Sequence, residues 1–87
     1  MFLFSISSAA TISGTIRDKK TGEPLPYANI VIAETDIGTA SDINGYYIIP
    51  LVEPGSYILQ VMMIGYAVSD NNLLVENNHI RLDIELT

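Results

Sequence analysis

The chain has 87 residues, no cysteine and a formal net charge of −6. A domain of this size buries only about 60–65% of the surface of its unfolded chain, and without cysteine it gains nothing from disulfides or a thiolate zinc site. The four basic residues form no stripe along the sequence, which argues against binding to nucleic acid, and the negative sign of the net charge argues against binding to anionic membrane surfaces. No apolar run approaches the ~20 residues of a membrane-spanning helix.

Residues 1–10, MFLFSISSAA, are first apolar, then small and polar, and they end in two alanines. This order is typical of the second half of a secretory signal peptide, although the basic segment that starts such peptides is missing. We therefore expect a truncated export signal at residues 1–10, with an ordinary N-terminus as the alternative. Residues 11–87 are expected to form one domain.

Alternation of apolar and polar residues runs through most of the chain and predicts strands rather than helices. Seven short strands are expected, at residues 11–17, 27–34, 38–41, 46–50, 57–64, 73–75 and 79–87. Glycine, proline, asparagine and aspartate mark the segments between them, namely a loop at 18–26 and turns at 52–56, 69–72 and 76–78. Short strands at this spacing are typical of a β-sandwich.

Two of these segments also indicate where they lie in the sandwich. Residues 57–64, YILQVMMI, are apolar on both faces, which favours a central or covered position. Residues 79–87, HIRLDIELT, alternate between an apolar row and a polar row. That pattern is expected of an antiparallel sheet with one face on a core and the other in water.

The stretches SGTIR, TGEPLP, GTASDINGYY, PGSY, IGY and LDIEL follow one another in an order and spacing that resembles the carboxypeptidase regulatory-like domain. The resemblance runs from about Ile12 to Leu86. It implies an all-β fold, a seven-stranded antiparallel β-sandwich of the prealbumin-like (transthyretin-like), Greek-key type. It says less about function, because this kind of fold is widely reused.

In that family, the version with these motifs is similar to the domain that precedes the plug of TonB-dependent outer-membrane receptors. The resemblance implies a non-catalytic accessory module in the periplasm or at the outer membrane of a Gram-negative bacterium. It implies no cofactor and no insertion of this domain into the membrane. The expected partner is a protein of the cell envelope, either the plug or barrel of a receptor or a periplasmic protein. The alternative is a stand-alone sandwich that binds a carbohydrate or calcium.

The stretch SDINGYY contains the oxygen ligands of a calcium loop and also the residues of a tight turn. With Gly45 at position 6 of a calcium loop, Asp42 and Asn44 fall on ligand positions, but the first and twelfth positions hold residues without ligand oxygens. A hairpin turn explains the same residues, because Asn-Gly accepts positive φ angles and Asp42 can form an Asx-turn. We favour the turn and keep Asp36, Asp42 and Asn44 as weak candidates for a metal site.

The other candidates for chemistry are a histidine and the tyrosines. His79 falls on the wet face of the last strand, with no serine or threonine placed to act as its nucleophile, so we expect a surface residue and no catalytic role. Tyr47 and Tyr57 fall on inward faces, which favours core packing over stacking on a sugar. Tyr66 is expected to be a corner tyrosine whose hydroxyl bonds to nearby backbone.

Overall fold

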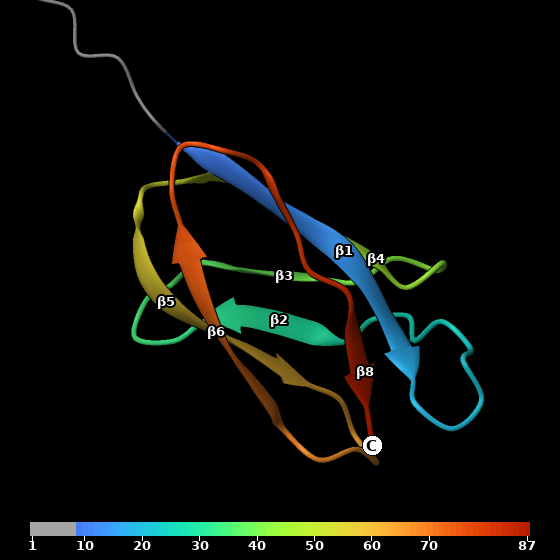
Figure 1. Cartoon of the computed structure of the whole chain (residues 1–87). Coiled ribbons are helices and arrows are strands. Elements are labelled where there is room, and N and C mark those ends of the chain that lie inside the picture. Colours follow the sequence, from blue (N-terminus) through green and yellow to red (C-terminus); the bar gives the residue numbers. More distant parts are fainter. Residues whose placement is uncertain (1–8) are drawn as a thin grey trace, which may run out of the picture.

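The computed structural model describes residues 9–87, and in that part of the chain it contains strands and turns but no helix (Figure 1). The all-β prediction is therefore confirmed. No helix that could cross a bilayer occurs among these residues. The expected signal remnant at residues 1–10 falls largely on residues 1–8, which lie outside the described residues. Ala10 already belongs to the first strand.

Two sheets face each other, as expected of a β-sandwich. The strand segments are β1 (Ala10–Asp18), β2 (Asn29–Ile32), β3 (Gly38–Ala40), β4 (Tyr46–Val52), β5 (Gly55–Met62), β6 (Ser69–Val75), β7 (Ile80–Arg81) and β8 (Ile84–Leu86). One sheet has the order β4-β1-β7, with β8 also paired to β1, and the other has the order β3-β2-β5-β6. If β7 and β8 are counted as one interrupted strand, the sandwich has the seven strands that were expected.

The last strand differs from the expectation in its direction. β7 and β8 both run parallel to β1, whereas an antiparallel partner was expected. The alternation of side chains is the same in both cases, since it reports which face is buried and not which way the neighbouring strand runs. The strand is also interrupted at Leu82 and Asp83, yet Ile12 pairs with Ile80 and Ile16 with Ile84 in one unchanged register. The interruption is therefore a local distortion.

The turn expected at residues 69–72 is wrong, because these residues form the first half of β6. The chain reverses earlier, where Tyr66 donates its N–H to the carbonyl of Met63 and Gly65 takes a φ of 91°. The run of Ser, Asp and Asn was interpreted as turn chemistry. In the structure these polar side chains suit an edge strand that has one face in water, and Gln60 of β5 donates to Asp70 across the ladder.

The core lies between the two sheets and consists largely of the inward rows that the alternation predicted, together with Val52, which was expected in a turn, and Val75, for which no face was predicted. Its largest fully buried side chains are Ile12, Ile16, Ile30, Ile32, Tyr47, Val52, Leu59, Val61, Val75 and Leu86. β5 lies inside its sheet, between β2 and β6, which confirms the central position expected for residues 57–64. The alternation of residues 79–87 is confirmed as well, with Ile84 and Leu86 buried and Arg81 and Glu85 exposed.

Candidate functional site

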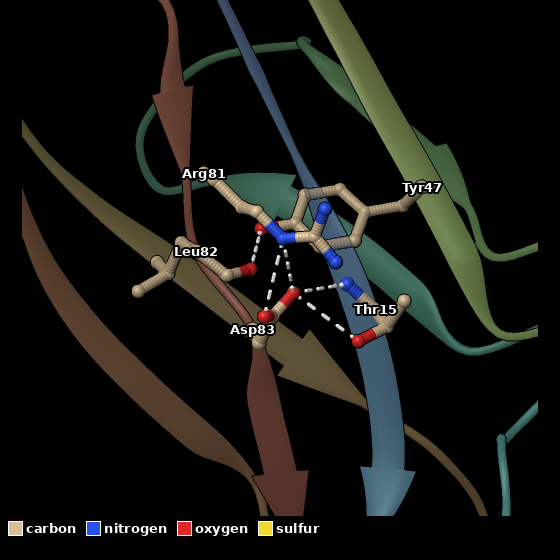
Figure 2. A network of polar contacts seen from close by, with 5 residues as sticks. All are labelled: Thr15, Tyr47, Arg81, Leu82 and Asp83. Atoms are coloured by element: carbon tan, nitrogen blue, oxygen red, sulfur yellow. Dashed lines mark hydrogen bonds and ion pairs between the residues drawn. The ribbon is translucent and has the colours of Figure 1, made fainter.

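The most connected polar group in the structure surrounds the interruption between β7 and β8 (Figure 2). At this point the last strand lies so close to β1 that a Cβ on Gly14 would overlap the carbonyl oxygen of Leu82. The N–H of Leu82 donates to the Ser13 carbonyl at 2.8 Å, and its carbonyl accepts from the hydroxyl of Tyr47 at 2.6 Å. Gly14 is therefore required here for close approach, and Tyr47 satisfies the displaced carbonyl.

The side chain of Asp83 accepts one backbone N–H of β1 beside the distortion. Its Oδ1 accepts from the backbone N–H of Thr15 at 2.9 Å and from the Thr15 hydroxyl at 3.1 Å. The Nε–H of Arg81 donates to the same carboxylate, at 3.3 Å to Oδ1 and 3.2 Å to Oδ2. Both side chains of this ion pair are more than half exposed, so the pair adds little stability. The bond from the Thr15 backbone fixes the carboxylate on β1.

The protonation of this group does not suit acid–base catalysis. The Thr15 N–H, assisted by Arg81, holds the pKa of Asp83 below its ordinary value, so the carboxylate is ionised and a weak base at neutral pH. Burial raises the pKa of Tyr47 well above its ordinary value, so its hydroxyl stays protonated and donates to Leu82. These contacts hold the last strand on β1, and we assign them a structural role.

A second polar pair ties the TGEPLP loop to the β5–β6 turn. The Tyr66 hydroxyl donates to Oδ2 of Asp18 at 2.7 Å, and Oδ1 of Asp18 accepts the backbone N–H groups of Lys20 at 2.7 Å and Thr21 at 3.1 Å. The hydrogen bond from the Tyr66 hydroxyl is the largest cause of the lowered pKa of Asp18, and the bonds from these two N–H groups lower it further. The expectation that Tyr66 bonds to nearby backbone is wrong, because its acceptor is a side chain far away in the sequence.

The corner arrangement expected of Tyr66 is made instead by Tyr57, whose hydroxyl donates to the carbonyl of Glu53 at 2.7 Å. Tyr57 is also half-buried against the core, as its inward position predicted. Asp18 was missed as a partner of Tyr66. The sequence does signal the local contacts of Asp18, since an aspartate before Lys-Lys-Thr-Gly commonly accepts backbone N–H groups two and three positions later, but it does not signal the contact with Tyr66.

The SDINGYY stretch forms a turn between β3 and β4. Oδ1 of Asp42 accepts the N–H groups of Asn44 at 2.8 Å and Tyr46 at 3.0 Å, so the expected Asx-turn is confirmed. The N–H of Gly45 donates to the Asp42 carbonyl, and that of Asp42 donates to the Tyr46 carbonyl. The two-residue hairpin with positive φ at both Asn44 and Gly45 is wrong, because only Gly45, with a φ of 77°, is in the left-handed region. In this turn, which Asp42 and Tyr46 close, the carbonyl of Gly45 accepts the N–H of Ile16 in β1 at 2.7 Å.

The three weak metal candidates are not brought together. Asp42 and Asn44 share the β3–β4 turn, whereas Asp36 lies in the β2–β3 turn at the other end of β3. Across the described residues, no three His, Cys, Asp or Glu side chains cluster closely enough to hold a metal ion. Oδ1 of Asp42 is already engaged by two backbone N–H groups. A calcium site that uses these residues stays a prediction.

His79 is exposed, and its Nδ1 accepts the backbone N–H of Thr11 at 3.1 Å. The contacts of Asp83, on the same strand face, go to Thr15 and Arg81. The histidine therefore fastens the start of the last strand to β1, and the geometry pairs it with no nucleophile among the described residues.

The comparisons with known proteins agree with this architecture. The model of the CarboxypepD_reg-like domain family matches residues 12–87. A TonB-dependent receptor P26 from Formosa agariphila is 33% identical over 86 residues, which cover 99% of this chain and 8% of that receptor. The chain thus spans a small part of the length of this curated relative.

Solved structures with the same architecture come from several kinds of protein. A chain of a type II cohesin–X-dockerin complex from Acetivibrio cellulolyticus matches with a TM-score of 0.74 and 24% identity, over 86% of this chain and 52% of that chain. The 5-hydroxyisourate hydrolase from Klebsiella pneumoniae matches with a TM-score of 0.68 and 16% identity, over 86% of this chain and 88% of that chain. At such low identity these likenesses show the fold alone.

Proposed function

Because the chain belongs to the CarboxypepD_reg-like domain family, we propose that it is a non-catalytic accessory module of a TonB-dependent outer-membrane receptor. In this proposal the domain lies in the periplasm, at the N-terminal side of the receptor plug, and serves nutrient uptake through contacts with another protein. The likeness to a TonB-dependent receptor over 99% of the chain carries the proposal.

The polar contacts support an accessory role. Asp83, Asp18 and Asp42 each accept backbone N–H groups that hold a strand or a turn in place. The hydroxyls of Tyr47 and Tyr57 donate to backbone carbonyls. Since these groups are engaged in holding the sandwich, none of them is free to act on a substrate in this arrangement.

The test is an immunoblot of fractionated source cells with an antibody raised against this chain, and a deletion strain serves as the control. We expect a band far heavier than 9.5 kDa in the outer-membrane fraction, since the curated relative is much longer than this chain. A band near 9.5 kDa in the soluble periplasmic fraction would contradict the proposal and favour a free-standing binding protein.

A further inference from the structure

Three of the four sheet edges carry features that discourage the addition of another strand. β4 contains Pro50, and its register with β1 shifts between Ala10 and Ile12. β3 has only three residues. The edge made by β7 and β8 is short and interrupted at Leu82 and Asp83. Prolines, register breaks and short strands are the usual ways in which natural sheets protect their edges.

β6 (Ser69–Val75) lacks all of these features. Its seven residues pair with β5 without a shift in register, and they include no proline, lysine or arginine. Within the described residues, β5 is the one strand that pairs with β6. The other side of β6 is therefore a regular, unpaired strand edge, which is a template for β-strand addition.

The hydrogen bonds and the register of β5 identify which backbone N–H and C=O groups of β6 face the open edge. Ala33 donates its N–H to the Ile58 carbonyl at 2.9 Å, so the backbone groups of Ile58 face β2. Successive residues of a strand direct these groups to opposite sides, so those of Leu59 face β6, where Leu59 pairs with Asn71. The backbone groups of Asn71 then face β5.

By the same alternation, the N–H and C=O groups of Asp70, Asn72 and Leu74 face the open edge. The side chains of these three residues are also exposed, on the outer face of the sheet. Leu74 is 62% exposed, and beside it Ile58 of β5 is 41% exposed. Both line a groove whose lining also includes Glu34 of the β2–β3 turn. The edge thus offers backbone partners, an apolar strip and carboxylates together.

The charge of the chain is divided unequally between its parts. Residues 27–79 contain six acidic residues and no lysine or arginine, so they carry the entire net charge of −6. The remaining residues balance, with four acidic and four basic side chains. Asp70 lies on β6, Glu76 directly follows it, and Glu53 precedes the end of β5 that pairs with Val75. The surroundings of the open edge are therefore acidic and favour a cationic ligand.

We propose that the open edge of β6 binds an extended, basic segment of a partner protein, which pairs with Asp70, Asn72 and Leu74 as an additional strand. Lysine or arginine side chains of that segment lie opposite Asp70 and near Glu76, and its apolar side chains cover Leu74 and Ile58. The inference rests on the proposed function, in which the domain acts through protein contacts, and it adds the surface and the chemistry of the partner. A second copy of this chain is a poor occupant, because each copy brings the same acidic surface to the contact.

The test uses the full chain and two fluorescein-labelled peptides, observed by fluorescence anisotropy at low salt. One peptide has lysine and valine in turn at every second position, with threonine between them, so that both lie on one face of the extended peptide, and the matched peptide has glutamate in place of each lysine. We expect the lysine peptide to bind and the glutamate peptide not to bind, because opposite charges across a strand pair attract and like charges repel.

Two substitutions locate the binding on β6. Asn72→Pro removes an N–H that faces the open edge and that β5 does not use, so the sandwich is expected to fold while peptide affinity falls at least about ten-fold. Asp70→Asn keeps the oxygen that accepts from Gln60 but removes the charge, and it is expected to weaken binding about two- to five-fold. Glu85→Gln removes one charge from β8 in the other sheet and is the matched control, with unchanged affinity expected.

Amide hydrogen exchange of the unmutated chain gives a second readout that needs no folded variant. The lysine peptide is expected to slow exchange at Asp70, Asn72 and Leu74. Three results would overturn the proposal: no binding of the lysine peptide, equal binding of the glutamate peptide, or binding that leaves these three amides unprotected. Dimers of the free chain in light scattering, with β6 protected, would assign the edge to a second copy instead. None of these results changes the cell fractionation, so the proposed function is tested separately.

Discussion

Removing the hydroxyl of Tyr47 should destabilise the sandwich without changing its packing volume appreciably. In Tyr47→Phe the ring still fills the core, where Tyr47 is 1% exposed, but the Leu82 carbonyl loses the donor that lies 2.6 Å away. A hydrogen bond of this kind contributes about 1 kcal/mol, and an acceptor left without a partner costs about 1–3 kcal/mol. We expect a loss of about 1–2 kcal/mol in the free energy of unfolding.

The expected change in melting temperature follows from the size of the chain. Unfolding entropy is about 2.1 cal/mol/K per residue near 60 °C, so a loss of 1 kcal/mol lowers the Tm of a domain this small by about 5 °C. Tyr47→Phe should therefore melt about 5–10 °C below the unmutated chain in a thermal scan followed by circular dichroism. Burial raises the pKa of Tyr47 in the folded chain, so the stability that the protonated hydroxyl contributes is fully present below the ordinary tyrosine pKa of 10.0. The scan is therefore run near pH 7.

The neighbouring tyrosine supplies the control. Tyr46 lies on the opposite face of β4 and is 39% exposed, so Tyr46→Phe should leave the Tm nearly unchanged. The reasoning is refuted if Tyr47→Phe and Tyr46→Phe melt at the same temperature. That result would mean that the Leu82 carbonyl finds another donor and that the contact with Tyr47 does not hold the interrupted strand.

Three further predictions test other contacts. The folded-state pKa of Asp83 is lowered, chiefly by the Thr15 N–H, so its contribution to stability is present above its ordinary value of 3.8 and is lost as the pH falls through the lowered value. The Tm difference between the unmutated chain and Asp83→Asn should therefore shrink in thermal scans from pH 7 down to pH 2–3, and a constant difference would contradict this. Gly45→Ala should lower the stability in urea more than Gly22→Ala, because both residues have positive φ but only the first Cβ would meet the Ile16 carbonyl. Equal losses would contradict this. If Asp42 serves only the turn, millimolar calcium should leave the Tm unchanged, and a rise would support a cation site.

Much of the architecture could be predicted from the sequence because burial acts on every second residue of a strand. The rows containing Ile12 and Ile16, or Ile84 and Leu86, are buried as the alternation indicated. Alternation holds no information on strand direction, which is why the parallel pairing of β8 with β1 was not predicted. Composition was misleading at residues 69–72, where polar residues occupy a strand with little cover and do not form a turn.

The contacts between polar side chains could not be predicted in the same way. The Tyr66 hydroxyl reaches Asp18, 48 residues earlier in the chain, and Asp83 reaches Thr15 across 68 residues. Such contacts depend on the register between β1 and the last strand and on the path of the turns, and neither is written in a local pattern. Local contacts were accessible, since the Asx-turn of Asp42 spans only a few residues and followed from turn chemistry.

The residues that carry the family likeness are largely occupied with holding the sandwich together. Gly14 gives the last strand room to approach β1, Gly45 connects the β3–β4 turn to Ile16, and Tyr66 ties two loops together. β6 contains none of the stretches on which the likeness rests, and it is the strand whose edge is open and acidic. The likeness therefore identifies the scaffold. In the strand-addition proposal, the choice of partner depends on residues of β6 such as Asp70 and Leu74, which lie outside those stretches. A relative with the same scaffold and a basic residue in place of Asp70 would be expected to select a different, less cationic segment.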